Sequence, residues 1–186
     1  MISKVVRPNR NRHLGARGAQ NCVIRKMTVK DANDASQVSI DAMVDSYKRY
    51  ENGFYPEKAH KFDVENCKPA HYIADLESKY LYSFVLEVDG RIIGVVKGKL
   101  FSQSGYAMIN WICIHPSQQR NGYGSKLIKY VMKYIKKNKC HKLSLNTMAF
   151  LIPAMSLYLR TGFVPEAYLR KQWWNVDFVQ MSIWLD

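Results

Sequence analysis

The eight residues QRNGYGSK, numbered 119–126, place two glycines one residue apart between two regular segments. Before them, residues 106–116 read YAMINWICIHP, a β-rich apolar run that ends at a proline. After them, residues 125–139 carry apolar side chains at helical spacing on one face and lysines largely on the other. Glycines between a strand and a helix let the backbone and the helix N-terminus approach a phosphate. We therefore expect a strand, a phosphate-binding loop and an amphipathic helix here.

Two common phosphate-binding loops do not match this stretch. A dinucleotide-binding fingerprint requires a third glycine where Leu127 stands, and an acidic residue about 20 positions later, which is also missing. A P-loop requires Gly-Lys-Ser or Gly-Lys-Thr, whereas the order here is Gly124-Ser125-Lys126. Two interpretations are left: a phosphate-binding loop of another class, or a structural turn between the strand and the helix.

Turn residues and apolar periodicity divide the rest of the chain. Asp31 or Asn33 is suited to cap the first long helix, and Asp89-Gly90 favours a tight hairpin. The expected elements are a strand at 22–28, a helix at 29–50, short helices and a loop at 51–80, two hairpin strands at 83–100, a strand at 142–150, a helix at 153–163 and a last strand or pair of strands at 173–185. We expect a flexible basic arm at 1–21 and a single α/β domain of the α+β type at 22–186.

The formal net charge of +13 is distributed unevenly along the 186 residues. Eight basic and no acidic residues precede Asp31, and twelve basic and no acidic residues lie between Asp89 and Glu166. A field of this sign attracts a polyanion or a multiply phosphorylated small molecule.

Several features predict a cytoplasmic protein that is not integral to a membrane. No apolar run reaches the roughly 18 residues of a membrane helix. The chain starts with a polar segment that lacks the apolar core of a secretory leader. The four cysteines are scattered without a CxxC pair, so we expect reduced thiols and no metal site.

Two patterns together resemble the GCN5-related N-acetyltransferase (GNAT) superfamily. Gln119, Gly122 and Gly124 are similar to its Q-x-x-G-x-G signature, which binds acetyl-CoA. Some 30 residues later, PAMSLYLRTGF is similar to the family's A-x-x-x-Y-x-x-x-G-F element. The resemblance covers residues 22–186 and is strongest at 106–163. It implies a mixed, mostly antiparallel sheet flanked by helices, with splayed central strands, and acetyl-CoA as the co-substrate.

The resemblance also implies which residues bind the cofactor. Main-chain groups of the strand before the loop would pair with the pantetheine arm, and the loop would hold the pyrophosphate. Carried over to this sequence, the strand residues are Ile112, Cys113 and Ile114, and the loop residues are Gln119, Arg120, Asn121, Gly122, Tyr123, Gly124 and Ser125. The side chains of Ile112, Cys113 and Ile114 fit a buried core equally well.

The reaction implied is direct attack of an amine on the thioester carbonyl, which requires a polarised carbonyl, a neutral amine and a stabilised thiolate. The N–H of Ile114 is the expected donor to the carbonyl. Tyr158 is the expected general acid for the thiolate, since a phenol can donate a proton to sulfur. A tyrosine packed on the inner face of its helix is the competing interpretation.

The chain departs from the family pattern at two places. Met108 stands where many members carry a glutamate base, which leaves a bound water, an acid from elsewhere such as Glu51, Glu57 or Glu87, or no dedicated base; His115 is another candidate relay. Leu151 replaces an asparagine that commonly supports the cofactor, and Asn146 is a candidate substitute.

The acceptor stays open at this point: a small-molecule primary amine or a protein N-terminus. Trp173 and Trp174 fit either the entrance of the acceptor or a cover for the sheet or a dimer contact. The alternative function is a nucleic-acid or ribosome-associated binding module without catalysis, because the chain is basic and aromatic. Nucleic acid could then bind through the basic arm, and a homodimer is compatible with either function.

Overall fold

Seven strands form one sheet in the order β1-β2-β3-β4-β5-β7-β6. A computed structural model describes residues 21–185 of the chain. The arm expected at 1–21 lies outside the described residues except for Asn21. The strands are β1 (Cys22–Lys26), β2 (Leu81–Val88), β3 (Arg91–Phe101), β4 (Tyr106–Ile114), β5 (Lys142–Met148), β6 (Val164–Trp173) and β7 (Val176–Trp184).

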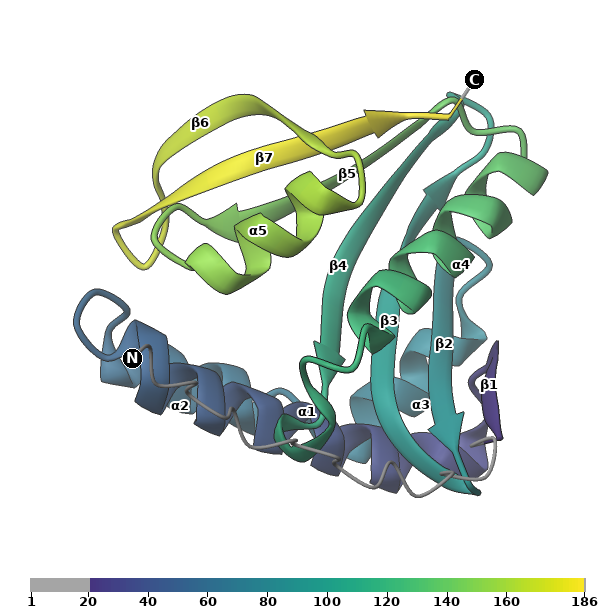
Figure 1. Ribbon diagram of the computed structural model, residues 1–186, viewed down its shortest axis with the longest axis horizontal. Helices are drawn as coiled ribbons and strands as arrows, with labels where there is room; N and C mark the ends of the chain where they lie inside the picture. Colours follow the sequence, from purple (N-terminus) through teal and green to yellow (C-terminus); the bar gives the residue numbers. More distant parts are fainter. Residues whose placement is uncertain (1–20, 186) are drawn as a thin grey trace, which may run out of the picture.

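Helices cover both faces of this sheet (Figure 1). They are α1 (Ala32–Ser46), α2 (Glu57–Glu65), α3 (Pro69–Glu77), α4 (Tyr123–Lys137) and α5 (Ile152–Arg160), with short turns η1 (Val29–Asp31), η2 (Tyr47–Glu51) and η3 (Pro116–Gln118). The apolar faces of α4 and α5 pack on one side, with Leu127 and Tyr158 in the larger core. On the other side, α1 and α3 pack against Val85, Val95 and Cys113. The predicted mixed, mostly antiparallel sheet flanked by helices is confirmed.

Strands β4 and β5 meet at the centre of the sheet. Among the strand pairs of residues 21–185 this pair is parallel, and the others are antiparallel. Pairing starts at Tyr106 with Lys142 and ends at Ile109 with Leu145. Beyond these residues the two strands diverge, as Figure 1 shows. The predicted splay of the central strands is therefore present, and we call the diverging region the split.

The end of the chain differs from the expectation. A strand or pair of strands was expected at 173–185, but β6 already begins at Val164 and pairs with β7 through a turn at Trp174-Asn175. Both turn residues have positive φ, 54° and 61°. The start of β6 was not predicted because β6 is a mostly exposed edge strand and lacks a clear apolar alternation. Pro165 also lies where the pairing register with β7 shifts.

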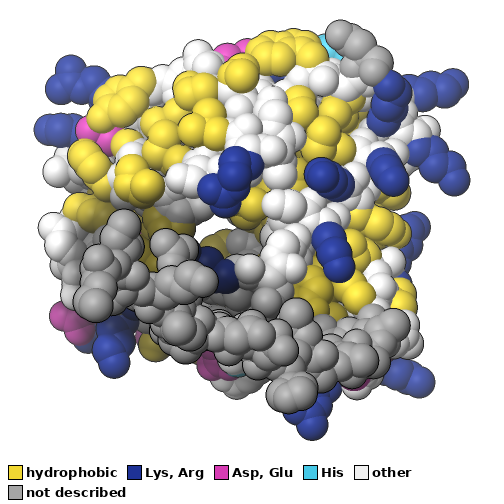
Figure 2. Space-filling model, viewed as in Figure 1, with side chains coloured by type: hydrophobic (Ala, Val, Ile, Leu, Met, Phe, Trp, Pro, Cys, Tyr) yellow, Lys and Arg dark blue, Asp and Glu magenta, His cyan; other side chains and the backbone are white. Residues whose placement is uncertain are grey.

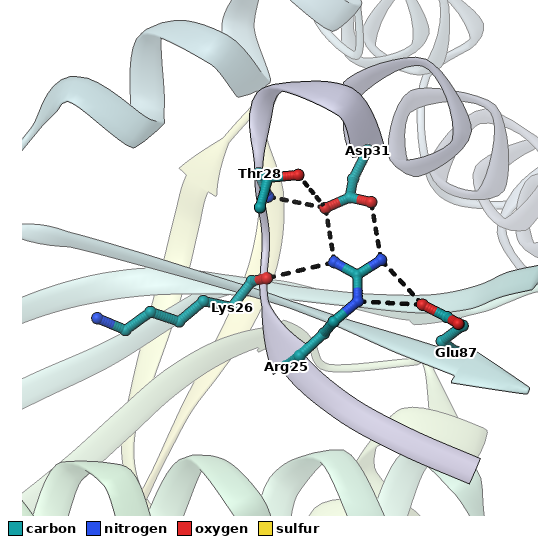
Figure 3. A network of polar contacts seen from close by, with 5 residues as sticks. All are labelled: Arg25, Lys26, Thr28, Asp31 and Glu87. Atoms are coloured by element: carbon teal, nitrogen blue, oxygen red, sulfur yellow. Dashed lines mark hydrogen bonds and ion pairs between the residues drawn. The ribbon is translucent and has the colours of Figure 1, made fainter. Parts of the chain in front are cut away.

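A compact ion network fixes the start of α1 (Figure 3). The guanidinium of Arg25 on β1 makes two hydrogen bonds to the Asp31 carboxylate, at 2.8 and 2.9 Å, and also binds Glu87 of β2. Asp31 in turn accepts hydrogen bonds from the backbone N–H and the hydroxyl of Thr28, both at 2.8 Å. These contacts join the edge strand to the helix that follows it. Asp31 rather than Asn33 occupies the N-cap position of α1, but its side chain bonds Thr28 and Arg25 and does not cap the N–H groups of α1.

Candidate active site

The split exposes main-chain groups of β4 that have no strand beside them. His115 donates its N–H to Ile93 of β3 at 2.8 Å. Hydrogen bonding in an antiparallel pair alternates along the strand, so Cys113 also faces β3. Ile112 and Ile114 therefore direct their N–H groups to the opposite edge, from which β5 has departed. Of the three strand residues predicted to bind the cofactor, these two present free main-chain groups to the split, whereas the backbone of Cys113 holds the strand in the sheet.

The predicted phosphate loop ends at the first turn of α4. Gly122 has φ of +79°, a conformation that favours glycine, and a side chain added there would meet no atom within 4 Å. The helix starts at the next residue, so the N–H groups of its first turn, including those of Gly124 and Ser125, point out of the helix end. Their dipoles point out of the N-terminus and favour an anion.

The second glycine of the loop has a packing role as well. A Cβ on Gly124 would lie 3.1 Å from a methyl group of Leu157 on α5, so any larger residue would require Leu157 to shift. The start of α4 is thereby held against the helix that carries Tyr158. This constraint joins the two sequence patterns in space, although they are some 30 residues apart.

Side chains of the loop fix its path. The amide nitrogen of Gln119 donates to the carbonyl oxygen of Ile114 at 3.1 Å, which ties the loop to the free edge of β4. The side chain of Asn121 donates to the Gln118 carbonyl at 3.2 Å. Arg120 is exposed with φ of +66°, and Tyr123 is buried. The predicted loop residues thus lie together at the end of the split.

Tyr158 lies on α5 and is 7% exposed. Burial raises the pKa of its phenol above the ordinary value, so the group is protonated at neutral pH and available as a proton donor. Its ring packs near Phe163 in the core shared with α4. Both interpretations of this tyrosine, an acid and a packed side chain, are compatible with this position.

The opposite face of β5 and β7 receives apolar contacts from η2 and α2, and we call it the acceptor face after the role proposed for it below. Met148 of β5 and Phe178 of β7 pack here against a cluster that includes Tyr55 and Ala59. Trp174, in the turn after β6, has its ring 5.5 Å from that of Phe62 on α2. Trp173 stacks edge-on against Phe178 at 5.0 Å. The two tryptophans therefore border the acceptor face.

Two carboxyl groups, a buried one at Glu51 and a half-buried one at Asp63, lie in the helical segment beside the acceptor face. Glu51 ends η2 and accepts a hydrogen bond from Ser46, and Asp63 of α2 accepts one from the Tyr55 hydroxyl at 2.6 Å. Burial raises the pKa of both groups, and the charge of Asp63 raises that of Glu51 further. A carboxyl group with a raised pKa is a stronger base than a free carboxylate, which suits it to accept a proton.

The other candidate bases lie elsewhere. Glu87 is held by Arg25 in the network at β1, and Glu57 is 67% exposed and paired with Lys61. His115 lies 3.4 Å from Asp41 of α1 and bonds Ser117, on the α1 side of the sheet. Among the acids and the histidine considered from the sequence, Glu51 is thus the one adjacent to the acceptor face.

The cysteines show no sign of a nucleophile. All four are free, and Cys113 lies in the core between β4 and α1, where its thiol is 3.5 Å from the Ser39 hydroxyl. Burial raises the pKa of Cys113 to about 11, so it is a thiol rather than a thiolate at neutral pH.

Two surface features surround the split. Figure 2 shows the molecule hollowed below α5, where β4 and β5 diverge, and lysine side chains gathered over α4. A separate hollow of about 390 Å³ lies between the C-terminal half of α4 and Trp184, remote from the glycine loop at the other end of the helix.

In residues 21–185, no helix is long and apolar enough to cross a membrane.

Comparisons with known proteins agree with this geometry. The sequence model of the acetyltransferase (GNAT) family matches residues 40–163, which include the split, the glycine loop and Tyr158. A search of curated proteins finds no significant match.

Solved structures share the fold at low sequence identity. The PaiA N-acetyltransferase from Thermoplasma acidophilum, in complex with coenzyme A, is 16% identical with a TM-score of 0.72, over 86% of this chain and 98% of that one. The spermidine N-acetyltransferase from Vibrio cholerae, with CoA and spermine, is 21% identical with a TM-score of 0.69, over 88% and 95%. The ribosomal-protein-S18-alanine N-acetyltransferase from Escherichia coli is 18% identical with a TM-score of 0.65, over 89% and 94%.

Proposed function

Because the chain belongs to the acetyltransferase (GNAT) family, we propose that it transfers an acetyl group from acetyl-CoA to a primary amine. The family uses acetyl-CoA, and one structural neighbour was crystallised with coenzyme A. Two other neighbours are named for acetylation of spermidine and of an alanine. These names support an amine acceptor, either a small molecule or a protein N-terminus. The alternative of a binding module without catalysis is not retained, because the family is one of enzymes.

One observation carries the proposal: the edge of β4 that faces the split and the N-terminus of α4 at Gly124 and Ser125 meet at the same point. Gln119 joins them, since its side chain bonds the carbonyl of Ile114. A ligand that combines a peptide-like arm with a diphosphate would pair its arm with Ile112 and Ile114 and its diphosphate with the turn at Gly122–Ser125. Coenzyme A has both parts, and the lysines of α4 add a favourable field.

The chain's own groups meet two demands of acyl transfer. The N–H of Ile114 would donate to the thioester oxygen as negative charge develops there. Tyr158, which is protonated at neutral pH, would give its proton to the departing thiolate. Acetyl-CoA supplies the activated acyl group, whose C–S bond breaks as the new C–N bond forms.

The third demand is removal of a proton from the amine. Neither β4 nor β5 carries a carboxylate in residues 106–114 and 142–148. We assign this role to Glu51, acting through a water molecule, since it lies beside the acceptor face with a raised pKa.

The test is a thermal shift with acetyl-CoA, followed by thiol release across four amines: spermidine, kanamycin, lysine and a peptide with N-terminal alanine. We expect acetyl-CoA to raise the melting temperature, and Gly122→Trp to abolish the shift by filling the cradle. The matched control is Gly90→Trp, since Gly90 has φ of +77° and open space but lies in the β2–β3 turn. No shift of the unmodified protein at millimolar acetyl-CoA would refute the proposed function.

Two further expectations stay predictions. A homodimer was compatible with the sequence, and one related spermidine N-acetyltransferase is dodecameric. Nucleic-acid binding through the basic arm concerns residues outside the described part of the chain.

A further inference from the structure

One buried side-chain polar atom has no hydrogen-bond partner in residues 21–185, and it lies at the split. The side-chain oxygen Oδ1 of Asn146 is shielded from solvent and accepts no hydrogen bond. A buried acceptor without a donor is rare in folded proteins, because it loses its hydration without compensation. An atom of this kind points to a donor that binds there from outside the chain.

The position of Asn146 along β5 places it where the strands separate. Leu145 is the last residue of β5 that pairs with β4, and Asn146 follows it. On its other side, Asn146 remains paired with Gln180 of β7, so its backbone is held in the sheet. The side chain is therefore presented at the split by a rigid element.

The alternation of side chains along β5 decides which face it occupies. Leu143 and Leu145 belong to the core with α4, α5 and Tyr158. Asn146 points to the opposite face, together with Met148, which packs on the acceptor face. In the proposed reaction the coenzyme approaches from the α4 side, so the ligand that meets Asn146 enters from the other side.

We propose that Asn146 is a substrate-binding residue whose Oδ1 accepts a hydrogen bond from the attacking amine and so selects primary over secondary amines. This inference rests on the proposed function and deepens it. A primary amine has two N–H bonds. One proton leaves to the base as the C–N bond forms and the C–S bond breaks, and the other stays in the product amide. Asn146 would hold the proton that stays.

The preference for primary over secondary amines follows from the number of N–H bonds in each. An N-methylated amine has a single N–H, and that proton must leave for the reaction to finish. It cannot remain bonded to Asn146, so the buried oxygen loses its donor in the later states of the reaction. A site built around a hydrogen bond to a substrate N–H discriminates strongly against an analogue that lacks it.

The experiment compares the best primary amine of the four-amine set with its N-methyl derivative, by thiol release. Asn146→Leu keeps the volume and removes the acceptor. We expect this variant to lower kcat/KM for the primary amine about 10- to 100-fold. The ratio of kcat/KM between the primary amine and its N-methyl derivative should become smaller. The KM for acetyl-CoA and the thermal shift with acetyl-CoA should stay unchanged. Gln180→Leu, the same change on the paired residue of β7, should keep the full preference.

Each other outcome is decisive. Unchanged kcat/KM for the primary amine in Asn146→Leu would overturn the inference. So would an unchanged preference for the primary over the N-methyl amine in this variant, because the preference would then have a steric cause. A change confined to the KM of acetyl-CoA would place the amide against the coenzyme instead. If the leucine variant does not fold, Asn146→Ala, which also lacks an acceptor, gives the same comparison. Failure of the unmodified protein to bind acetyl-CoA is a separate result and refutes the proposed function.

Discussion

The continuous helical segment formed by α1 and η2 carries buried carboxyl groups at its two ends, Asp31 and Glu51, in opposite electrostatic surroundings. Asp31 and Glu51 are each 7% exposed. Asp31 faces the guanidinium of Arg25, which lowers the pKa of the carboxyl to about 2. Glu51 has a hydroxyl partner in Ser46 but, within residues 21–185, no cation paired with it, and burial raises its pKa. Equal burial therefore gives a permanent anion at one end of the helix and a group able to exchange protons at the other.

The difference separates structure from chemistry. The Asp31 end joins β1, β2 and α1 through a complete set of donors, so its charge serves stability (Figure 3). The Glu51 end closes a π-helical turn, η2, a rare geometry that is often found at functional sites. It adjoins the acceptor face. A protein tolerates an unpaired buried carboxyl group where its proton transfer is used.

The largest expected effect is on catalysis at the Glu51 end. Glu51→Gln keeps the volume and the hydrogen bond to Ser46 but removes the proton acceptor. We expect kcat/KM for the amine to fall about 100-fold at pH 7, with the acetyl-CoA thermal shift retained. In the unmodified protein, activity should rise with pH through the raised pKa of Glu51, because only the carboxylate accepts a proton. Thiol release from pH 5 to 9 measures both.

Tyr158→Phe is the control for this variant. It should also lower turnover with little change in acetyl-CoA affinity, but it should keep the rise with pH, since the phenol acts as an acid. Unchanged turnover would remove Tyr158 from the mechanism. Loss of the pH-dependent rise in Tyr158→Phe and not in Glu51→Gln would reverse the assignment of the two groups.

The next effect is on stability at the Asp31 end. Asp31→Asn leaves the Arg25 guanidinium without its carboxylate partner, and we expect a loss of about 2 kcal/mol in the free energy of unfolding. Urea denaturation with constant m-value measures this loss. Glu57→Gln is the matched control, because it breaks the exposed pair with Lys61, and it should leave the midpoint unchanged. Equal midpoints for all three proteins would show that the network contributes no stability.

The smallest effect is the pH dependence of stability. The folded pKa of Asp31 is lowered, so its contribution is complete above the unfolded value of 3.8 and is lost as pH falls toward about 2. The folded pKa of Glu51 is raised, so ionising it costs stability as pH rises past the unfolded value of 4.5. Asp31→Asn should flatten the acid side of the stability profile, and Glu51→Gln should raise stability modestly at pH 7. Thermal melts from pH 2 to 7 would contradict this contrast if the two variants shifted alike.

Much of the fold could be predicted from local patterns. The hairpin at Asp89-Gly90 follows from two positive φ angles that this dipeptide tolerates, and α4 follows from one apolar face. β6 could not be predicted, because an edge strand with exposed side chains carries no periodic signal. Apolar periodicity in a sequence reflects burial of one face of an element, and β6 has little buried surface on either face.

The sequence by itself determined the glycine loop, the helix that begins at it and the tyrosine some 35 residues later, because each depends on backbone freedom or periodicity within a short segment. Only the tertiary structure decided the rest of the site. It set the point at which β4 and β5 separate, the face that Asn146 occupies, and the pairing of Asp31 but not Glu51 with a cation. The physical reason is that burial and the partners of a charge come from residues distant in the chain, so the same carboxyl group has a different pKa in each place.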